Sequence, residues 1–207
     1  AATFNFPQGI ATDGTNVYVA DTFNHVIRQI VIATGVTTTL AGTPGSSGTA
    51  TGAVSTGRLN NPLGLAVSGT DLYVADTSNH AIRKIAIATG VISNFAGTPG
   101  SASAGSTDAT GVLASFKNPG AIAAEGTTNL YVADTGNHTI RKIVIAGGGV
   151  VTTHAGTANT VGGSVVDHRA VGAYRHRREA QSLREVLLRE ALDVQEVVEA
   201  LLRSGPA

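Results

Sequence analysis

The chain has 207 residues, enough for one large or two small domains, and its 14 Lys and Arg residues balance its 14 Asp and Glu residues. Neutrality argues against nucleic acid or an anionic membrane as the main partner, because both require a positive surface. No apolar run reaches the roughly 18–20 residues that cross a bilayer. Without cysteine the chain has no disulfide and no thiolate, and without methionine at residue 1 we expect it to be processed, excised from a longer protein or engineered.

One short motif, Asp-Thr-x-Asn-His-x-Ile-Arg, occurs three times, at spacings of 55 and 58 residues. A long fixed period of this kind is typical of repeat proteins, in which each copy is one structural unit. We take the shared polar residues as a structural motif: Asp21, Asn24, His25, Arg28, Asp76, Asn79, His80, Arg83, Asp134, Asn137, His138 and Arg141.

Each copy predicts four strands, since β-branched residues and Tyr alternate with turn residues. In the first copy we expect strands at residues 9–12, 17–21, 26–32 and 36–40, the last being a polar outer edge. The connection at 22–25 is tight, and Asn24 is suited to a positive φ. Residues 44–61 and 99–118 are rich in Gly, Ser, Thr and Ala, which favours extended surface loops.

Apolar residues occupy both parities of the middle strands, as Tyr18 and Val19 do, so both faces of each sheet need cover. Four-stranded sheets covered by copies of themselves are blades of a β-propeller. We therefore predict an all-β domain at residues 1–164, with blades at about 4–60, 61–117 and 118–160, followed by a helical tail at 165–207.

The pattern Pro-x-Gly-(Ile/Leu)-Ala, then Tyr-Val-Ala-Asp-Thr-x-Asn-His-x-Ile-Arg, then a Val-rich strand ending in Ala-Gly-Thr, resembles the NHL repeat. This resemblance implies a propeller that usually has six blades, and often a binding function. Because three blades do not close a ring, we expect a homodimer in which two half-propellers complete one six-bladed ring. The alternative is that further blades belong to a longer parent.

The tail has a different composition, because residues 167–207 hold half of all charged residues. Its apolar residues follow a helical stripe, and it forms either one helix or two short helices that meet near residues 192–193. We expect this helix to pack or oligomerise through Leu183, Leu187, Ala191, Val194, Val198 and Leu201.

The three motif histidines are candidate metal ligands, but equivalent positions on successive blades lie far apart, so we interpret them as turn residues. Asp21 and Arg28, with their repeat equivalents, are expected to form a partly buried ion pair rather than a charged site. We expect no catalytic, cofactor-binding or metal residue and no cofactor.

Two classes of function follow. A non-enzymatic scaffold for a protein, peptide or glycan agrees with near-identical repeats that carry no singular catalytic cluster. The alternative that the family resemblance implies is a metal-dependent lyase or hydrolase of propeller fold, in which unique residues enter the central channel. A third interpretation is an engineered or fragmentary repeat assembly that has no ligand.

Overall fold

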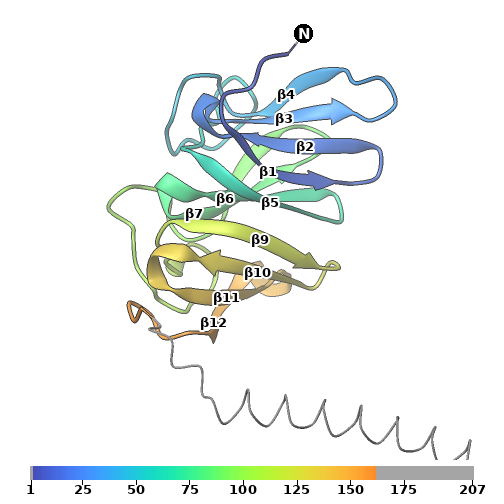
Figure 1. The fold of residues 1–207 in the computed structure, drawn as a ribbon. Helices are drawn as coiled ribbons and strands as arrows, with labels where there is room; N and C mark the ends of the chain where they lie inside the picture. The colour runs from blue at the N-terminus through green and yellow to red at the C-terminus, as the bar shows by residue number, and fades with distance from the viewer. Residues whose placement is uncertain (1, 162–207) are drawn as a thin grey trace, which may run out of the picture. The chain divides into compact units, whose positions relative to one another are not determined.

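The computed structural model describes residues 2–161, so the predicted tail helix and its six apolar residues lie outside the described part of the chain and stay a prediction. The described residues form three four-stranded antiparallel sheets, each with its strands in chain order. We refer to them as the first, second and third blade (Figure 1). Their strands are β1 Pro7–Thr12, β2 Asn16–Asp21, β3 Val26–Val31, β4 Thr37–Ala41, β5 Pro62–Ser68, β6 Asp71–Asp76, β7 Ala81–Ala86, β8 Val91–Ala96, β9 Pro119–Glu125, β10 Asn129–Asp134, β11 Thr139–Val144 and β12 Val150–Ala155.

The blades contact each other mainly through their first strands, β1 against β5 and β5 against β9, so the sheets fan out from this inner edge as propeller blades do (Figure 1). Two apolar cores lie between the blades rather than within them. One joins Tyr18 and Ile27 of the first blade to Leu65 of the second, and the other joins Tyr73 to Leu130 of the third. The expectation that each blade covers its neighbour is therefore confirmed.

A 3-10 turn connects the second and third strands of every blade: Thr22–Asn24, Thr77–Asn79 and Thr135–Asn137. The prediction that Asn24 takes the positive φ is wrong, because His25 does so instead, with φ 58°. The turn closes when the His25 N–H donates to the Thr22 carbonyl at 3.1 Å, which places the left-handed residue after the turn. Asn24 stays inside the turn, where its side chain reaches Asp21.

The long segments between blades are not purely surface loops, which corrects the second expectation. Leu59 and Phe116, near the ends of these segments, are fully buried in the two inter-blade cores. The first segment pairs Gly52 with Ile92 of the blade that follows it, and the second segment packs the 3-10 turn Gly111–Leu113 against β8 of the blade that precedes it. Burying one such side chain stabilises a fold by about 1.5–3 kcal/mol, so these segments belong to the core.

Candidate functional site

The motif aspartate organises the start of its own blade. One oxygen of Asp76 accepts the Asn60 N–H at 2.7 Å, and the other accepts the Asn79 amide at 2.8 Å and the Arg83 guanidinium at 3.0 Å. Asp134 repeats all three contacts in the third blade, with Lys117, Asn137 and Arg141 as donors. Both oxygens of the carboxylate therefore have hydrogen-bond donors, which is the usual condition for a charge in a protein interior.

The predicted ion pair is fully buried in two blades and looser in one. Arg83 and Arg141 have no exposed surface, and each also donates to a carbonyl of the segment that precedes its blade, Ala50 and Thr107. Burial raises the pKa of Asp76 to about 6, although Asn79, Arg83 and Asn60 act in the opposite direction. In the first blade, Arg28 Nε lies 3.9 Å from Asp21 and its side chain is 17% exposed.

The motif histidines join one blade to the next. The Asn61 N–H donates to Nδ1 of His25 at 3.2 Å, and the Asn118 N–H donates to Nδ1 of His80 at 3.1 Å. An accepting Nδ1 requires the neutral imidazole with its proton on Nε2. Burial lowers the pKa of both histidines below the usual value, which favours this form. The described contacts of His25 and His80 are thus those of joint residues, in keeping with their interpretation as turn residues.

In the first two blades, the threonine after the motif aspartate makes a second contact across the joint, which the sequence pattern alone did not reveal. The Thr22 hydroxyl donates to the Pro62 carbonyl at 2.9 Å, and the Thr77 hydroxyl donates to the Pro119 carbonyl at 2.7 Å. The Asp-Thr step that all three copies share was the signal for it. Each of the two joints therefore contains one Thr-to-Pro bond and one backbone-to-His bond.

Glycine permits the close approach of the inner strands at both joints. A Cβ at Gly9 would lie 1.9 Å from the Leu63 carbonyl oxygen, and a Cβ at Gly64 would lie 2.4 Å from the Gly120 carbonyl oxygen. Real Cβ contacts stay beyond about 3 Å, so no larger residue fits without moving the blades apart. The equivalent position in the third blade is Ala121, which is exposed.

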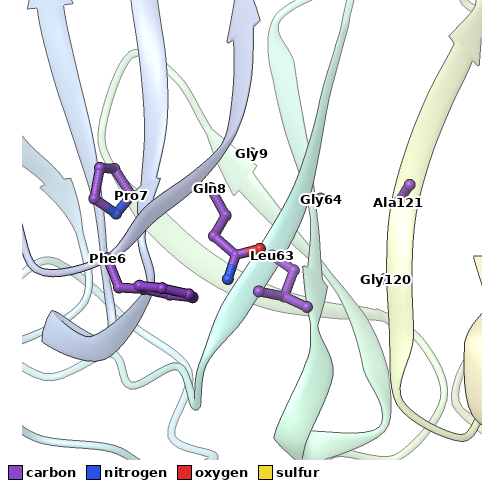
Figure 2. A pocket seen from close by; sticks show the side chains of 8 residues that line it. All are labelled: Phe6, Pro7, Gln8, Gly9, Leu63, Gly64, Gly120 and Ala121. Carbon is purple, nitrogen blue, oxygen red and sulfur yellow. The ribbon is translucent and has the colours of Figure 1, made fainter.

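An open pocket of about 630 Å³ lies where β1, β5 and β9 begin (Figure 2). Its lining is mostly backbone and apolar side chain, and Gln8 supplies the one polar side chain among the eight described residues that form it. These are Phe6, Pro7, Gln8, Gly9, Leu63, Gly64, Gly120 and Ala121. We call this the hub pocket. Its size falls within the roughly 300–1,000 Å³ of small-ligand sites.

Within residues 2–161 no group of three or more His, Asp or Glu side chains is arranged to hold a metal ion. No described helix is both long and apolar enough to span a membrane.

Comparison with known proteins agrees with the repeat geometry. The family model named NHL repeat matches residues 59–85, which run from the end of the first inter-blade segment into β7. Residues 59–85 form an NHL repeat. The predicted resemblance to this family is thereby confirmed.

The chain spans only a small part of the curated relatives that it matches. NHL repeat-containing protein 2 of Bos taurus is 37% identical over 45% of this chain and 14% of its own length. Protein SUPPRESSOR OF QUENCHING 1, chloroplastic, of Arabidopsis thaliana is 42% identical over 38% of this chain and 8% of its own length. Among solved structures, an auxiliary nutrient binding protein from Bacteroides thetaiotaomicron has a TM-score of 0.56 at 22% identity and covers 72% of this chain and 37% of its own. This last similarity supports the propeller-like fold of the three blades.

Proposed function

We propose that this chain is a non-enzymatic binding scaffold for a protein, peptide or glycan, and that two copies associate to complete a six-bladed ring. The observation that carries the scaffold proposal is the use of the polar motif residues. In the second blade, Asp76, Asn79, His80 and Arg83 all contact their own blade, the preceding segment or the next joint. These contacts all lie within the fold, which supports a structural role for the motif.

Support for the ligand site comes from the hub pocket. Its wall offers apolar side chains and strand backbone, and the Gln8 amide can both donate and accept a hydrogen bond. Such a lining suits a peptide group or a sugar hydroxyl better than it suits an ion. Two copies would place two such pockets around one axis.

Support for association comes from the unequal burial of repeat-equivalent residues. Ile10 in β1 is 68% exposed, whereas its equivalent Leu65 in β5 is 5% exposed because the first blade covers it. On the opposite side, Ile140 is 40% exposed, whereas Ile82 is fully buried. Covering both faces removes apolar surface from water, which favours a closed assembly.

Two measurements test the proposal with the full chain. Sedimentation equilibrium at micromolar concentration should give twice the chain mass. Peptide-display and glycan-array selections should enrich ligands whose affinity falls in the Gln8→Ala variant and is kept in Gln29→Ala, a partly exposed glutamine outside the hub pocket. A single-chain mass would refute the association, and stoichiometric bound metal together with hydrolytic or lyase turnover would refute the scaffold.

A further inference from the structure

The open face of the third blade carries an apolar pocket of about 220 Å³, whose lining includes Ala123, Tyr131, Ala133 and Ile140. We call this the acceptor pocket. The equivalent residues of the first blade, Ala11, Tyr18, Ala20 and Ile27, belong to or pack against the core that contains Leu65 of the second blade. At an internal joint, therefore, the corresponding place is closed by the large side chain in the inner strand of the next blade.

The open face of the first blade carries the matching side chain. Ile10 holds the repeat position of Leu65 and is exposed. Its strand begins in the same conformation as β5, because Phe6 has φ 56° and its equivalent Asn61 has φ 49°. A phenylalanine in this left-handed region is uncommon, so the geometry of the joint is kept here even without the asparagine that favours it.

The polar groups that form the contacts of a joint are also present, one set on each of the two open faces. Thr135 and His138 on the third blade are equivalent to the Thr22 and His25 pair, and both are exposed. Among the described residues, the Thr135 hydroxyl bonds only to the Ala133 carbonyl of its own blade, at 3.4 Å. The first blade offers the Pro7 carbonyl and the Phe6 N–H, which are equivalent to the partners of Thr22 and His25.

On the two open faces, the outermost strands carry polar residues at positions that are apolar at the internal joints. The apolar Leu40 and Ile92 share the first inter-blade core, and Phe95 and Val151 share the second. The pairing of β3 with β4, β7 with β8 and β11 with β12 places His154 on the third blade and Thr37 on the first blade at the same positions. An imidazole facing a hydroxyl is a compatible polar pair, just as the internal pairs are compatible apolar pairs.

We infer that the third blade of one copy receives the first blade of a second copy head to tail, with Ile10 of the second copy in the acceptor pocket. The Thr135 hydroxyl donates to the Pro7 carbonyl of the second copy, and Nδ1 of His138 accepts from its Phe6 N–H. This inference rests on the proposed self-association and identifies the joint that produces it. Two such joints close a two-copy ring, because each chain contributes one face of each kind.

Ala121 makes this joint looser than the internal ones. A methyl group at the equivalent glycines would lie 1.9 Å and 2.4 Å from the carbonyl oxygen of the neighbouring inner strand. The inner strands of the two copies must therefore stand apart by roughly 1 Å more than β1 and β5 do. Removing this methyl should tighten the association.

The first test uses native mass and circular dichroism of three full-length proteins. Ile10→Glu places a charge in the acceptor pocket and should give a folded single chain, since residue 10 is exposed in the free copy. Leu113→Glu is the matched control, because Leu113 is 76% exposed and lies outside both faces, and it should keep the two-copy mass. A two-copy wild type with a two-copy Ile10→Glu variant would overturn the joint while leaving self-association intact. A single-chain wild type would overturn both.

The second test checks the geometry of the joint. Ala121→Gly should lower the dissociation constant between copies by about tenfold, since relief of an overpacked contact is worth about 1.4 kcal/mol or more. An unchanged or weaker association would overturn the proposed packing.

The chain has no cysteine, so Phe6→Cys and His138→Cys proteins can also be mixed and joined with a short bismaleimide. Linked Phe6→Cys and His138→Cys chains are expected, whereas Phe6→Cys with His80→Cys should not link, because Asn118 of the same chain already occupies the joint at His80. The reverse pattern would refute the head-to-tail arrangement.

Discussion

The Arg83 side chain offers a test of how much the buried ion pair stabilises its blade. Arg83→Ala removes the bond to Asp76 at 3.0 Å and the bond to the Ala50 carbonyl at 3.1 Å, in a place without solvent. Breaking a buried pair from one side costs about 3–5 kcal/mol. Asp76 keeps two donors, Asn60 and Asn79, so we expect the free energy of unfolding to fall by about 3 kcal/mol, near the lower end of that range.

The first blade supplies the control for this measurement. Arg28→Ala removes the same side chain at the equivalent position, but Arg28 Nε lies 3.9 Å from Asp21 and the side chain is partly exposed. Arg28 is not within hydrogen-bond distance of Asp21, and its side-chain hydrogen bond goes to the Thr39 hydroxyl, so we expect a loss of about 1 kcal/mol. Urea denaturation of both variants, followed by circular dichroism, should therefore separate them by about 2 kcal/mol or more. Equal losses for Arg28→Ala and Arg83→Ala would refute the view that burial by the preceding segment determines the strength of the pair.

Two further predictions concern the joints between blades. Gly64→Ala places a methyl 2.4 Å from the Gly120 carbonyl oxygen and should lower the free energy of unfolding by about 1–3 kcal/mol in the same assay. A tolerated Gly64→Ala would contradict the close approach of the inner strands. Burial lowers the pKa of His80 in the fold, so the unfolded chain binds more protons than the folded chain. The stability that neutral His80 contributes is therefore complete above about pH 6.5, and it is lost as the pH falls through the lowered pKa. The loss of unfolding free energy between pH 7 and pH 5 should be smaller in His80→Gln than in the wild type. Asp76 contributes equally to both proteins, so its contribution cancels in the difference. Equal losses would contradict the proposed Nδ1 acceptor.

The periodic part of the fold could be predicted from the sequence because it depends on local pattern. The repeated strands and the polar edge strand follow from residues that are close together in the chain, and the structure contains them with ends that differ by one or two residues. The turn was predicted in the right place with the wrong left-handed residue. Asn and His both follow Asp in the motif, and the closing bond from the His25 N–H to the Thr22 carbonyl, together with the bond from Asn24 to Asp21, decides between them.

The contacts between blades could not be predicted in the same way, because they depend on residues that are 36–58 positions apart. Thr22 has the sequence pattern of an ordinary turn residue. Its acceptor, the Pro62 carbonyl, lies 40 residues later in the chain, so no local pattern indicates this contact. Leu59 and Phe116 stand in segments of surface-like composition, and their burial is decided by the blades on either side. Identical histidines in three copies give the same sequence signal whether they bind a metal or hold a joint.

The Ala50 and Thr107 carbonyls accept hydrogen bonds from the next motif arginine, Arg83 or Arg141, and this bears on how such a chain gains or loses repeats. A gene duplication that begins at the first proline of a blade would separate the motif arginine from the carbonyls that accept its hydrogen bonds. The new repeat would then have a partly solvated ion pair like that of Arg28. A duplication that also carries the preceding segment would deliver these carbonyls and the arginine together. The unit that can be duplicated intact is therefore a blade together with the segment that precedes it. Circular permutants whose new termini lie within that segment should be less stable than those whose new termini lie in the β1–β2 hairpin.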